Sequence, residues 1–400
     1  MTPFLELMLV LAVIVLGAKL AGWALGKLNQ PTVVGEIAFG LLLGPTVFDL
    51  LGQPLFTHAA ATGETIHMMA ELGVVLLMFL AGLETDLGAM RRVGLPAISA
   101  AIGGVVLPFF GGWGFGVLVG LPINESIFIG TILTATSVSI SAQTLLELKK
   151  LRTKEGMTIL GAAVIDDVLG ILMLSVVVAL FATAGGPAPA LWLVVVKMVA
   201  YFVIAVAIAP LARAFLKWFS RLPLNQPLTA AALVLVLVYS WSAEFLGGLA
   251  AITGAYLIGI LLGNTEFKER LESVTQVFTY GFFVSIFFVD IGMRANLREA
   301  LSGPLAWLGL AIIVIAIVGK VVGSGVGARL TGFSNNEALR VGTGMVSRGE
   351  VGLIVAAIGV ERQVITPEIF SLMVLMVVVT TLITPMLLRL SFRAGPAAEG

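Results

Sequence analysis

The sequence predicts an all-α integral membrane protein with about thirteen transmembrane helices. Its 400 residues are 59% hydrophobic and only 12% charged, and the mean hydropathy is +1.08. A soluble domain carries about 25% charged residues, so a chain this apolar takes the bilayer as its solvent. Apolar runs of about twenty residues, the length that crosses the hydrocarbon core, recur along the chain with short connections between them.

The predicted spans follow these apolar runs in order. They lie near residues 4–25, 32–50, 67–83, 95–118, 126–147, 157–182, 190–216, 227–243, 246–263, 270–292, 304–328, 337–359 and 367–389. No segment between them is long enough for a separate soluble domain. The first run lacks a preceding basic region and is long enough to span the membrane, so we expect no cleavable signal peptide.

Basic residues are distributed unequally between the predicted loops. Of the 23 Lys and Arg residues, sixteen fall on one side and only Arg294, Arg298 and Arg362 on the other. Cytoplasmic loops are enriched in basic residues, so we expect the N-terminus outside and the C-terminus inside, in a bacterial or archaeal cytoplasmic membrane. Lys19 and Lys197 lie within spans, and the sequence assigns them no role beyond reaching toward an interface.

Several classes of function have no support in the composition. The net charge is zero and no basic block exists, which argues against nucleic-acid binding. Cysteine is absent, and the two histidines, His58 and His67, flank a predicted loop rather than lie inside a span. No nucleophile–base pair or cofactor motif is evident, so we expect neither an enzyme nor a bound cofactor.

Asp166 and Asp167 are the sharpest functional signal. They stand near the middle of the sixth predicted span, where each ionisable group costs several kcal/mol and therefore needs a reason. Adjacent helical residues point about 100° apart, so one carboxylate can meet a fixed partner while the other faces a cavity. Repulsion and desolvation favour a proton on one of them unless a cation replaces it. Competition of this kind is what an ion exchanger needs; a carboxylate pair locked in a structural salt-bridge network is the alternative.

Lys320 is the natural counter-charge, because it lies mid-span and too deep to reach either interface. It is expected to pair with one aspartate, either permanently as a brace between two helices or releasing that aspartate when a cation binds.

Two predicted spans carry interruptions. The fifth contains Thr-Ala-Thr-Ser-Val-Ser at 134–139, where a break at Thr136 and Ser137 would free hydroxyl and carbonyl oxygens for a hard cation. The twelfth contains Gly-Thr-Gly-Met-Val-Ser-Arg-Gly-Glu-Val-Gly at 342–352, with Arg348 and Glu350 pointing to nearly opposite faces. Interrupted spans at comparable positions in two halves predict an inverted-repeat transporter. The alternative for the hydroxyls at 134–139 is that they hydrogen-bond to the backbone within a regular helix.

Other charges and glycines are weaker signals. Asp290 and Arg294, four residues apart, are typical of an ion pair at a helix end. Glu71 is expected toward the outer face and Glu84 toward the inner face, and with Asp290 they are candidates for an access funnel. The glycines at 319, 323 and 327 predict close helix packing.

The motifs resemble those of the cation–proton antiporter superfamily, and within it the bacterial electrogenic Na⁺/H⁺ antiporters with an aspartate pair. The matching stretches run in order along the whole chain and include residues 29–37, 41–45, 79–86, 135–139, 160–170, 319–320 and 347–354. The resemblance implies an inverted-repeat fold with two crossing broken helices, assembled as a homodimer. It implies a dimerisation scaffold at 1–85 and 226–295, an ion-transporting core at 95–183 and 304–392, and a connecting helix at 184–225.

The resemblance also implies roles for individual residues. Asp167 would bind the cation, with Thr136 and Ser137 beside it, and Asp166 would pair with Lys320. We expect exchange of Na⁺ or Li⁺ for H⁺, with two protons per cation and elevator-like movement of the core. K⁺/H⁺ exchange, sodium-coupled symport of an organic anion and a cation-gated receptor are the alternatives.

Overall fold

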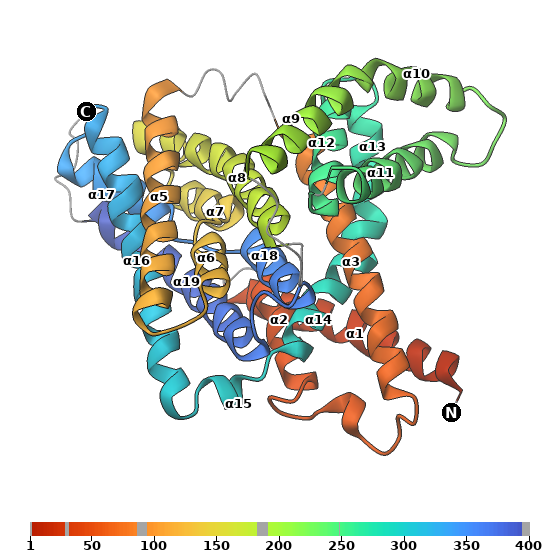
Figure 1. The fold of residues 1–400 in the computed structure, drawn as a ribbon, viewed down its shortest axis with the longest axis horizontal. Helices are drawn as coiled ribbons and strands as arrows, with labels where there is room; N and C mark the ends of the chain where they lie inside the picture. Colours follow the sequence, from red (N-terminus) through yellow and green to blue (C-terminus); the bar gives the residue numbers. More distant parts are fainter. Residues whose placement is uncertain (1, 29–31, 86–93, 182–190, 248, 394–400) are drawn as a thin grey trace. The chain divides into compact units, whose positions relative to one another are not determined.

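The computed structural model describes residues 2–28, 32–85, 94–181, 191–247 and 249–393, and no strand occurs in these ranges (Figure 1). Eight of the described helices are long and apolar enough to cross a membrane, or up to nine if one bent pair forms a single span. Shorter apolar helices lie at 32–43, 251–263 and 351–361. The prediction of an all-helical membrane protein is confirmed. The count of thirteen spans stays a prediction.

The chain forms two compact units, each assembled from three separate stretches. Unit 1 comprises Met1–Leu20, Leu50–Asp86 and Leu174–Asp290, and unit 2 comprises Ala21–Asp49, Leu87–Met173 and Ile291–Gly400. Three helices run from one unit into the other: α1 (Pro3–Lys27), α8 (Lys154–Phe181) and α14 (Val284–Arg294).

Unit 1 otherwise contains the following described elements. They are η1 (Leu50–Gly52), α3 (Ala59–Glu84), α9 (Leu191–Ala207), α10 (Ala209–Phe219), α11 (Pro227–Phe245), α12 (Ala251–Gly263), α13 (Lys268–Phe278) and η2 (Thr279–Phe283). Helices α3 and α12 pack together through glycine. A Cβ on Gly82 would meet the backbone of Tyr256, and one on Gly259 would meet the backbone of Phe79. Small residues therefore let these two backbones approach, as is common between helices in lipid.

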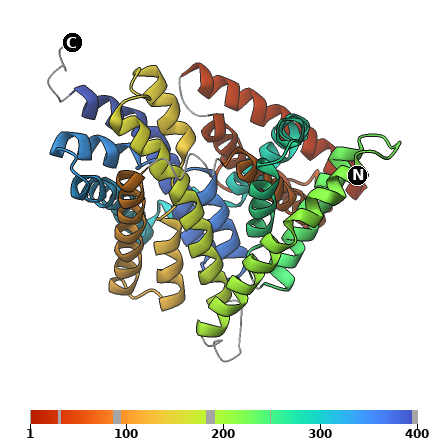
Figure 2. The same ribbon diagram turned by 90° about the horizontal axis from the view of Figure 1, so that it is seen from above.

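The pair α9 and α10 bends by 41° at Ile208 (light green in Figures 1 and 2). Pro210 lacks a backbone N–H, so the helical hydrogen-bond ladder is interrupted here. The hydroxyl of Tyr239 on α11 donates to the carbonyl of Ala205 at 3.1 Å, just before the bend. In return the hydroxyl of Tyr201 on α9 donates to the carbonyl of Tyr239 at 3.0 Å. This reciprocal tyrosine contact satisfies backbone groups that lipid cannot.

Element η2 is a five-residue π-helix that joins α13 to α14 within one continuous span. A π-helical turn shifts the backbone hydrogen bonds by one residue. The ammonium of Lys19 on α1 donates to the carbonyl of Tyr280 in this turn at 2.8 Å. Lys19 therefore contacts a second helix from within the first span, whereas the sequence offered only an interfacial position.

Unit 2 contains the remaining described helices. They are α2 (Thr32–Leu43), α5 (Gly94–Leu118), α6 (Ile123–Ile132), α7 (Val138–Glu147), α15 (Leu297–Ala300), α16 (Gly303–Leu330), α17 (Asn335–Gly344), α18 (Glu350–Glu361) and α19 (Pro367–Arg393). Helix α2 is shorter than the predicted span at 32–50, because Gly44 and Pro45 follow its last residue and proline cannot continue a helix.

Helices α5 and α16 lie side by side along a seam of glycines (Figure 1). A Cβ on Gly323 would meet the carbonyl of Gly103, and one on Gly327 would meet the carbonyl of Ser99. A Cβ on Gly319 would lie 3.1 Å from the Cα of Pro108. The packing role predicted for these glycines of α16 is confirmed.

One expectation about the histidines is wrong. Helix α3 begins at Ala59, eight residues before the predicted span, so His67 lies inside a helix rather than at the edge of a loop. Residues 59–66 are less apolar than the run that follows, and the hydropathy pattern alone therefore placed the helix start too late.

Candidate functional site

Two helical spans of unit 2 are interrupted at similar positions. Helix α6 ends at Ile132 and α7 begins at Val138, while α17 ends at Gly344 and α18 begins at Glu350. Both breaks contain hydroxyl residues or glycine. A hydroxyl side chain can bond to nearby backbone groups in place of the helical bonds, and glycine, which has no side chain, adopts non-helical backbone easily. The two broken helices predicted from the sequence are therefore present.

The breaks cross each other through paired hydrogen bonds. The N–H of Ser137 donates to the carbonyl of Ser347 at 2.9 Å. In return the Oγ of Ser347 donates to the carbonyl of Ser137 at 2.7 Å. The hydroxyl of Ser141, one turn into α7, donates to the carbonyl of Gly344 at 2.6 Å. These bonds satisfy backbone groups that would otherwise be buried without partners.

Four helix ends surround this crossing. The N-termini of α7 and α18 carry partial positive charge, and the C-termini of α6 and α17 carry partial negative charge. Backbone amides and carbonyls at such ends are unsatisfied within their own helices. The crossing can therefore hold either sign of charge inside an apolar span without a full counter-ion.

Asp166 on α8 and Lys320 on α16 form a buried ion pair in the same unit. The lysine Nζ lies 3.1 Å from Oδ1 and 3.0 Å from Oδ2 of the aspartate. Both side chains are fully shielded from solvent. Charges this deep are tolerated only when they compensate each other, because desolvating each ion costs several kcal/mol.

Glycine makes room for this pair. A Cβ on Gly104 of α5 would lie 3.4 Å from the Nζ and Cδ of Lys320 and would collide with the Oγ of Ser324. Ser324 stands one turn after Lys320, and its hydroxyl has no hydrogen-bond partner among the described residues. The α5–α16 seam therefore brings a lysine, a buried hydroxyl and a neighbouring backbone into one small space.

Arg348 adds a second buried cation. Its side chain is completely buried, and Nη2 donates to the carbonyl of Ala316, one turn before Lys320, at 3.0 Å. The Nε of Arg348 has no partner within the described ranges. Arg348, in the second break, is therefore bonded to α16 one turn before the lysine that pairs with Asp166.

Thr136 supplies an oxygen that is not already used. It lies in the first break, is 2% exposed, and its Oγ1 has no hydrogen-bond partner in the described part of the chain. Ser137 is equally buried, but its backbone is committed to Ser347. A buried hydroxyl without a partner costs about 1–3 kcal/mol, so a bound cation would recover that cost at Thr136.

Other residues singled out from the sequence fall in different places. Asp167 follows Asp166 on α8, and Glu350 is the first residue of α18, but both side chains lie outside the described residues. Asp166, Lys320, Thr136, Ser137 and Arg348 all belong to unit 2.

Glu71, Glu84 and Asp290 belong to unit 1. His67 joins two of them: its Nδ1 lies 3.2 Å from Oδ2 of Asp290, and its Nε2 lies 3.2 Å from Oε1 of Glu71. Glu84 ends α3, thirteen residues after Glu71 and thus about 20 Å farther along the helix. The acids therefore lie in two separate places, Glu71 with Asp290 of α14 around His67, and Glu84 at the end of α3.

Sequence reasoning missed some residues that hold the crossing in place. Thr381 on α19 donates its hydroxyl to the carbonyl of Arg348, and Ser141 bonds to Gly344. The run of Thr380, Thr381 and Thr384 within an apolar span was an available signal for Thr381, because buried hydroxyls in lipid require acceptors. Nothing in the sequence indicated which carbonyl Ser141 would reach.

A family profile described as "Sodium/hydrogen exchanger, transmembrane" matches residues 12–392. The chain belongs to the sodium/hydrogen exchanger family. This exchanger is 37% identical over 389 residues to the Na⁺/H⁺-K⁺ antiporter GerN of Bacillus cereus, with 97% of each chain covered. It is 40% identical over 383 residues to a probable Na⁺/H⁺ antiporter of the same organism, GerT, covering 96% of this chain and 98% of that one.

The exchanger also shares its fold with a solved structure. It superimposes on the sodium proton antiporter MjNhaP1 of Methanocaldococcus jannaschii with a TM-score of 0.71, covering 98% of this chain and 99% of that one at 17% identity. The membership predicted from the motifs is confirmed, and with it a multi-pass membrane protein of a cation–proton antiporter family.

Proposed function

We propose that this protein exchanges Na⁺, or Li⁺, for protons across the cytoplasmic membrane. The observation that carries the proposal is the Asp166–Lys320 pair, buried in the same unit as two crossed helix breaks. A cation entering such a site meets carboxylate and hydroxyl oxygens, the ligands that hard cations prefer. A proton competes for the same carboxylate, so the site exchanges one for the other.

The two aspartates divide the work in this proposal. Asp167 carries the cation in one direction and a proton in the other, with Thr136 and Ser137 contributing oxygens. Asp166 leaves Lys320 when the cation binds, and the freed lysine releases a second proton. Arg348 and Glu350 form the supporting charged network around the break.

Two protons per monovalent cation make transport electrogenic. One net charge then crosses the membrane in each cycle, and a membrane potential of 100 mV contributes about 2.3 kcal/mol to the free energy of that cycle. The membrane potential alone can therefore drive cation export when the proton gradient is small.

The division of the chain suggests how access alternates. The predicted core at 95–183 and 304–392 falls largely in unit 2, and the predicted scaffold at 1–85 and 226–295 falls largely in unit 1. We propose that the core moves as an elevator against the scaffold of a homodimer, with residues 184–225 as the connection. The bend at Ile208 lies in that connection.

The charged groups of unit 1 line the aqueous approach in this scheme. With the N-terminus outside, Glu71 and Asp290 stand on the outer side around His67, and Glu84 stands on the inner side. Acidic groups along an approach raise the local concentration of cations.

Potassium is the second candidate ion. The name of the relative GerN includes K⁺ as well as Na⁺, and it matches nearly the whole chain. Selection between these ions depends on small differences in the size of the site. Purified protein in liposomes, tested against gradients of Na⁺, Li⁺ and K⁺ in turn, measures that choice directly by the quenching of an internal pH dye.

The same liposomes test the mechanism. Asp167→Asn is expected to abolish exchange while the thermal unfolding midpoint stays near that of wild type. The control is Glu64→Gln, which also replaces a carboxylate by an amide but at an exposed position of α3, and it should leave exchange intact. Persistent exchange in Asp167→Asn would show that another residue binds the transported cation. Proton flux that is insensitive to an imposed K⁺–valinomycin potential would refute the two-proton stoichiometry.

A further inference from the structure

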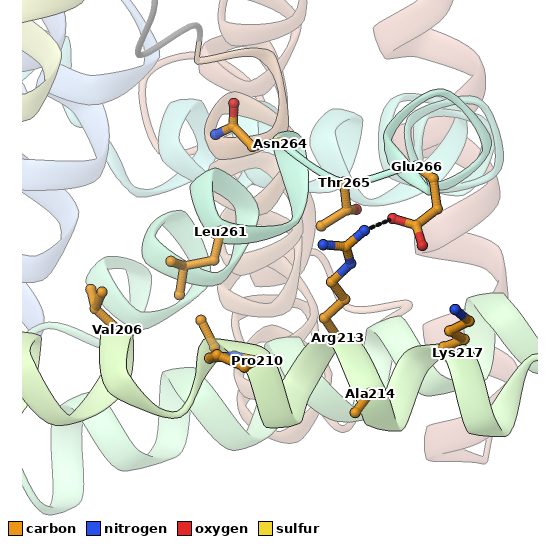
Figure 3. A pocket seen from close by; sticks show the side chains of 10 residues that line it. Val206, Pro210, Arg213, Ala214, Lys217, Leu261, Asn264, Thr265 and Glu266 are labelled. Carbon is orange, nitrogen blue, oxygen red and sulfur yellow. Dashed lines mark hydrogen bonds and ion pairs between the residues drawn. The ribbon is translucent and has the colours of Figure 1, made fainter.

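A groove of about 480 Å³ lies in unit 1, outside the ion site (Figure 3). One wall is the end of α9 and the start of α10, and the other is the end of α12 with the loop after it. Val206, Pro210 and Leu261 line one part, whereas Arg213, Lys217 and Glu266 line another. The groove is therefore apolar at one end and charged at the other.

The charged end carries one uncompensated positive charge. Arg213 and Lys217 are four residues apart on α10, so they share a face and both point toward the loop that carries Glu266 (Figure 3). Arg213 Nη2 lies 2.5 Å from Oε2 of Glu266. The side chain of Lys217 is exposed and makes no hydrogen bond or ion pair within the described part of the chain. Two cations and one carboxylate leave a net charge of +1.

Glu266 stays ionised and holds Arg213. Its pKa is lowered from the ordinary carboxyl value by a hydrogen bond from its own backbone N–H, by Arg213 and by the positive charge of Lys217. Lys217 therefore remains the cation that is available to a ligand.

The exposed side chains of α10 are typical of a helix at a membrane surface. Leu211 and Trp218 on α10 are 69% and 58% exposed, and an exposed tryptophan is typical of the headgroup level. Arg221 follows on the same segment, and such basic clusters mark the cytoplasmic side. At the apolar end, Val206 of α9 is 49% exposed, so this end can contact an acyl chain.

We propose that this groove binds the phosphodiester headgroup of an anionic phospholipid of the inner leaflet, with the phosphate on Lys217. The charge match is one to one, because a phosphatidylglycerol headgroup carries a single negative charge. The lipid tail lies along Val206 and Pro210. An isologous second copy fits less well, since its own Lys217 would meet the same positive face.

Native mass spectrometry of the purified protein, given equal amounts of phosphatidylglycerol and phosphatidylcholine with matched chains, tests the proposal. Wild type should retain phosphatidylglycerol selectively. Lys217→Gln should lower that retention about fivefold, the effect of one basic residue at a charged membrane surface. Arg221→Gln, an equal loss of charge one turn away and outside the groove, should retain the lipid. Glu266→Gln should raise retention, because it frees Arg213.

Ala214→Trp separates the groove from simple surface charge. Ala214 is an exposed groove residue, so the indole fills the space without changing charge and retention should fall. Equal losses from Lys217→Gln and Arg221→Gln, or full retention by Ala214→Trp, would overturn the proposal. So would displacement of the lipid by equimolar glycerol phosphate, which shares the phosphate but has no tail, or retention confined to monomers, which would mark the groove as covered by a second copy. Thermal unfolding midpoints and exchange rates near wild type show that each variant is folded.

Discussion

Ser137 and Ser347 hold each other across the two helix breaks, each using the other's carbonyl as an acceptor. Neither break can shift along its span without losing a bond made by the other. These two bonds therefore couple the two breaks directly, within the unit that contains Asp166 and Lys320.

Gly349 should tolerate no side chain at this crossing. A Cβ there would lie 2.7 Å from the Cβ and Oγ of Ser137, so Gly349→Ala forces the breaks apart. We expect a destabilisation of about 1–3 kcal/mol and a larger loss of exchange. Thermal unfolding and liposome flux measure the two effects. Gly114→Ala, where a Cβ meets nothing within 4 Å, is the control; equal behaviour of the two variants would contradict the close crossing.

The ion pair should show the asymmetry of buried charges. Lys320→Met leaves the Asp166 carboxylate buried without its partner and should cost about 3–5 kcal/mol of stability. Adding Asp166→Asn removes the orphaned charge and should restore most of that loss. A double-mutant cycle on thermal unfolding in a fixed detergent measures the coupling. Additive effects of the two substitutions would show that the pair contributes no mutual stabilisation.

Thr136→Val should separate ion binding from folding. The hydroxyl has no partner to lose, so stability should stay the same or rise. If the oxygen contacts the transported cation, the KM for Na⁺ should rise about tenfold. Thr134→Val is the contrast, because that hydroxyl donates to the carbonyl of Thr131 at 2.7 Å and its loss should affect stability instead. An unchanged KM in Thr136→Val would remove this residue from the site.

The Arg213–Glu266 pair should persist under mildly acidic conditions. The folded-state pKa of Glu266 is lowered, so the pair's contribution is present above the ordinary carboxyl pKa and is lost only as the pH falls through the lower, folded value. The difference in unfolding midpoint between wild type and Glu266→Gln should therefore stay constant from neutral pH to the ordinary glutamate range and shrink below it. A difference that disappears at higher pH would mean that the carboxyl titrates normally.

The order of the helices could be predicted because a membrane-spanning helix is recognisable in the sequence by its length and hydropathy. The breaks were also visible, since hydroxyls at 134–139 and glycines at 342–352 interrupt otherwise apolar spans. A pair between Lys320 and one of the two aspartates could be predicted because opposite charges buried in lipid need each other, and the family resemblance implied that the partner is Asp166. Their roles in transport, with that of Asp167, stay predictions.

Other features depend on three-dimensional register and could not be predicted. The partners of Ser141 and Thr381 are carbonyls more than thirty residues away in the chain. The π-helix at 279–283 has no clear signature in its own sequence. The bend at Ile208, by contrast, had a readable cause in Pro210, which stands inside a predicted span.

Lys19 has a consequence for biosynthesis. Its contact, the carbonyl of Tyr280, is made 261 residues later in the chain. Lys19 stands in the second half of α1, and a lysine inside a membrane helix costs up to about 2.5–3.5 kcal/mol on insertion scales. When the first helix enters the membrane, most of the chain is still unsynthesised, so the lysine enters without this partner. The hydrogen bond to Tyr280 can form only after the π-helical turn has itself been inserted.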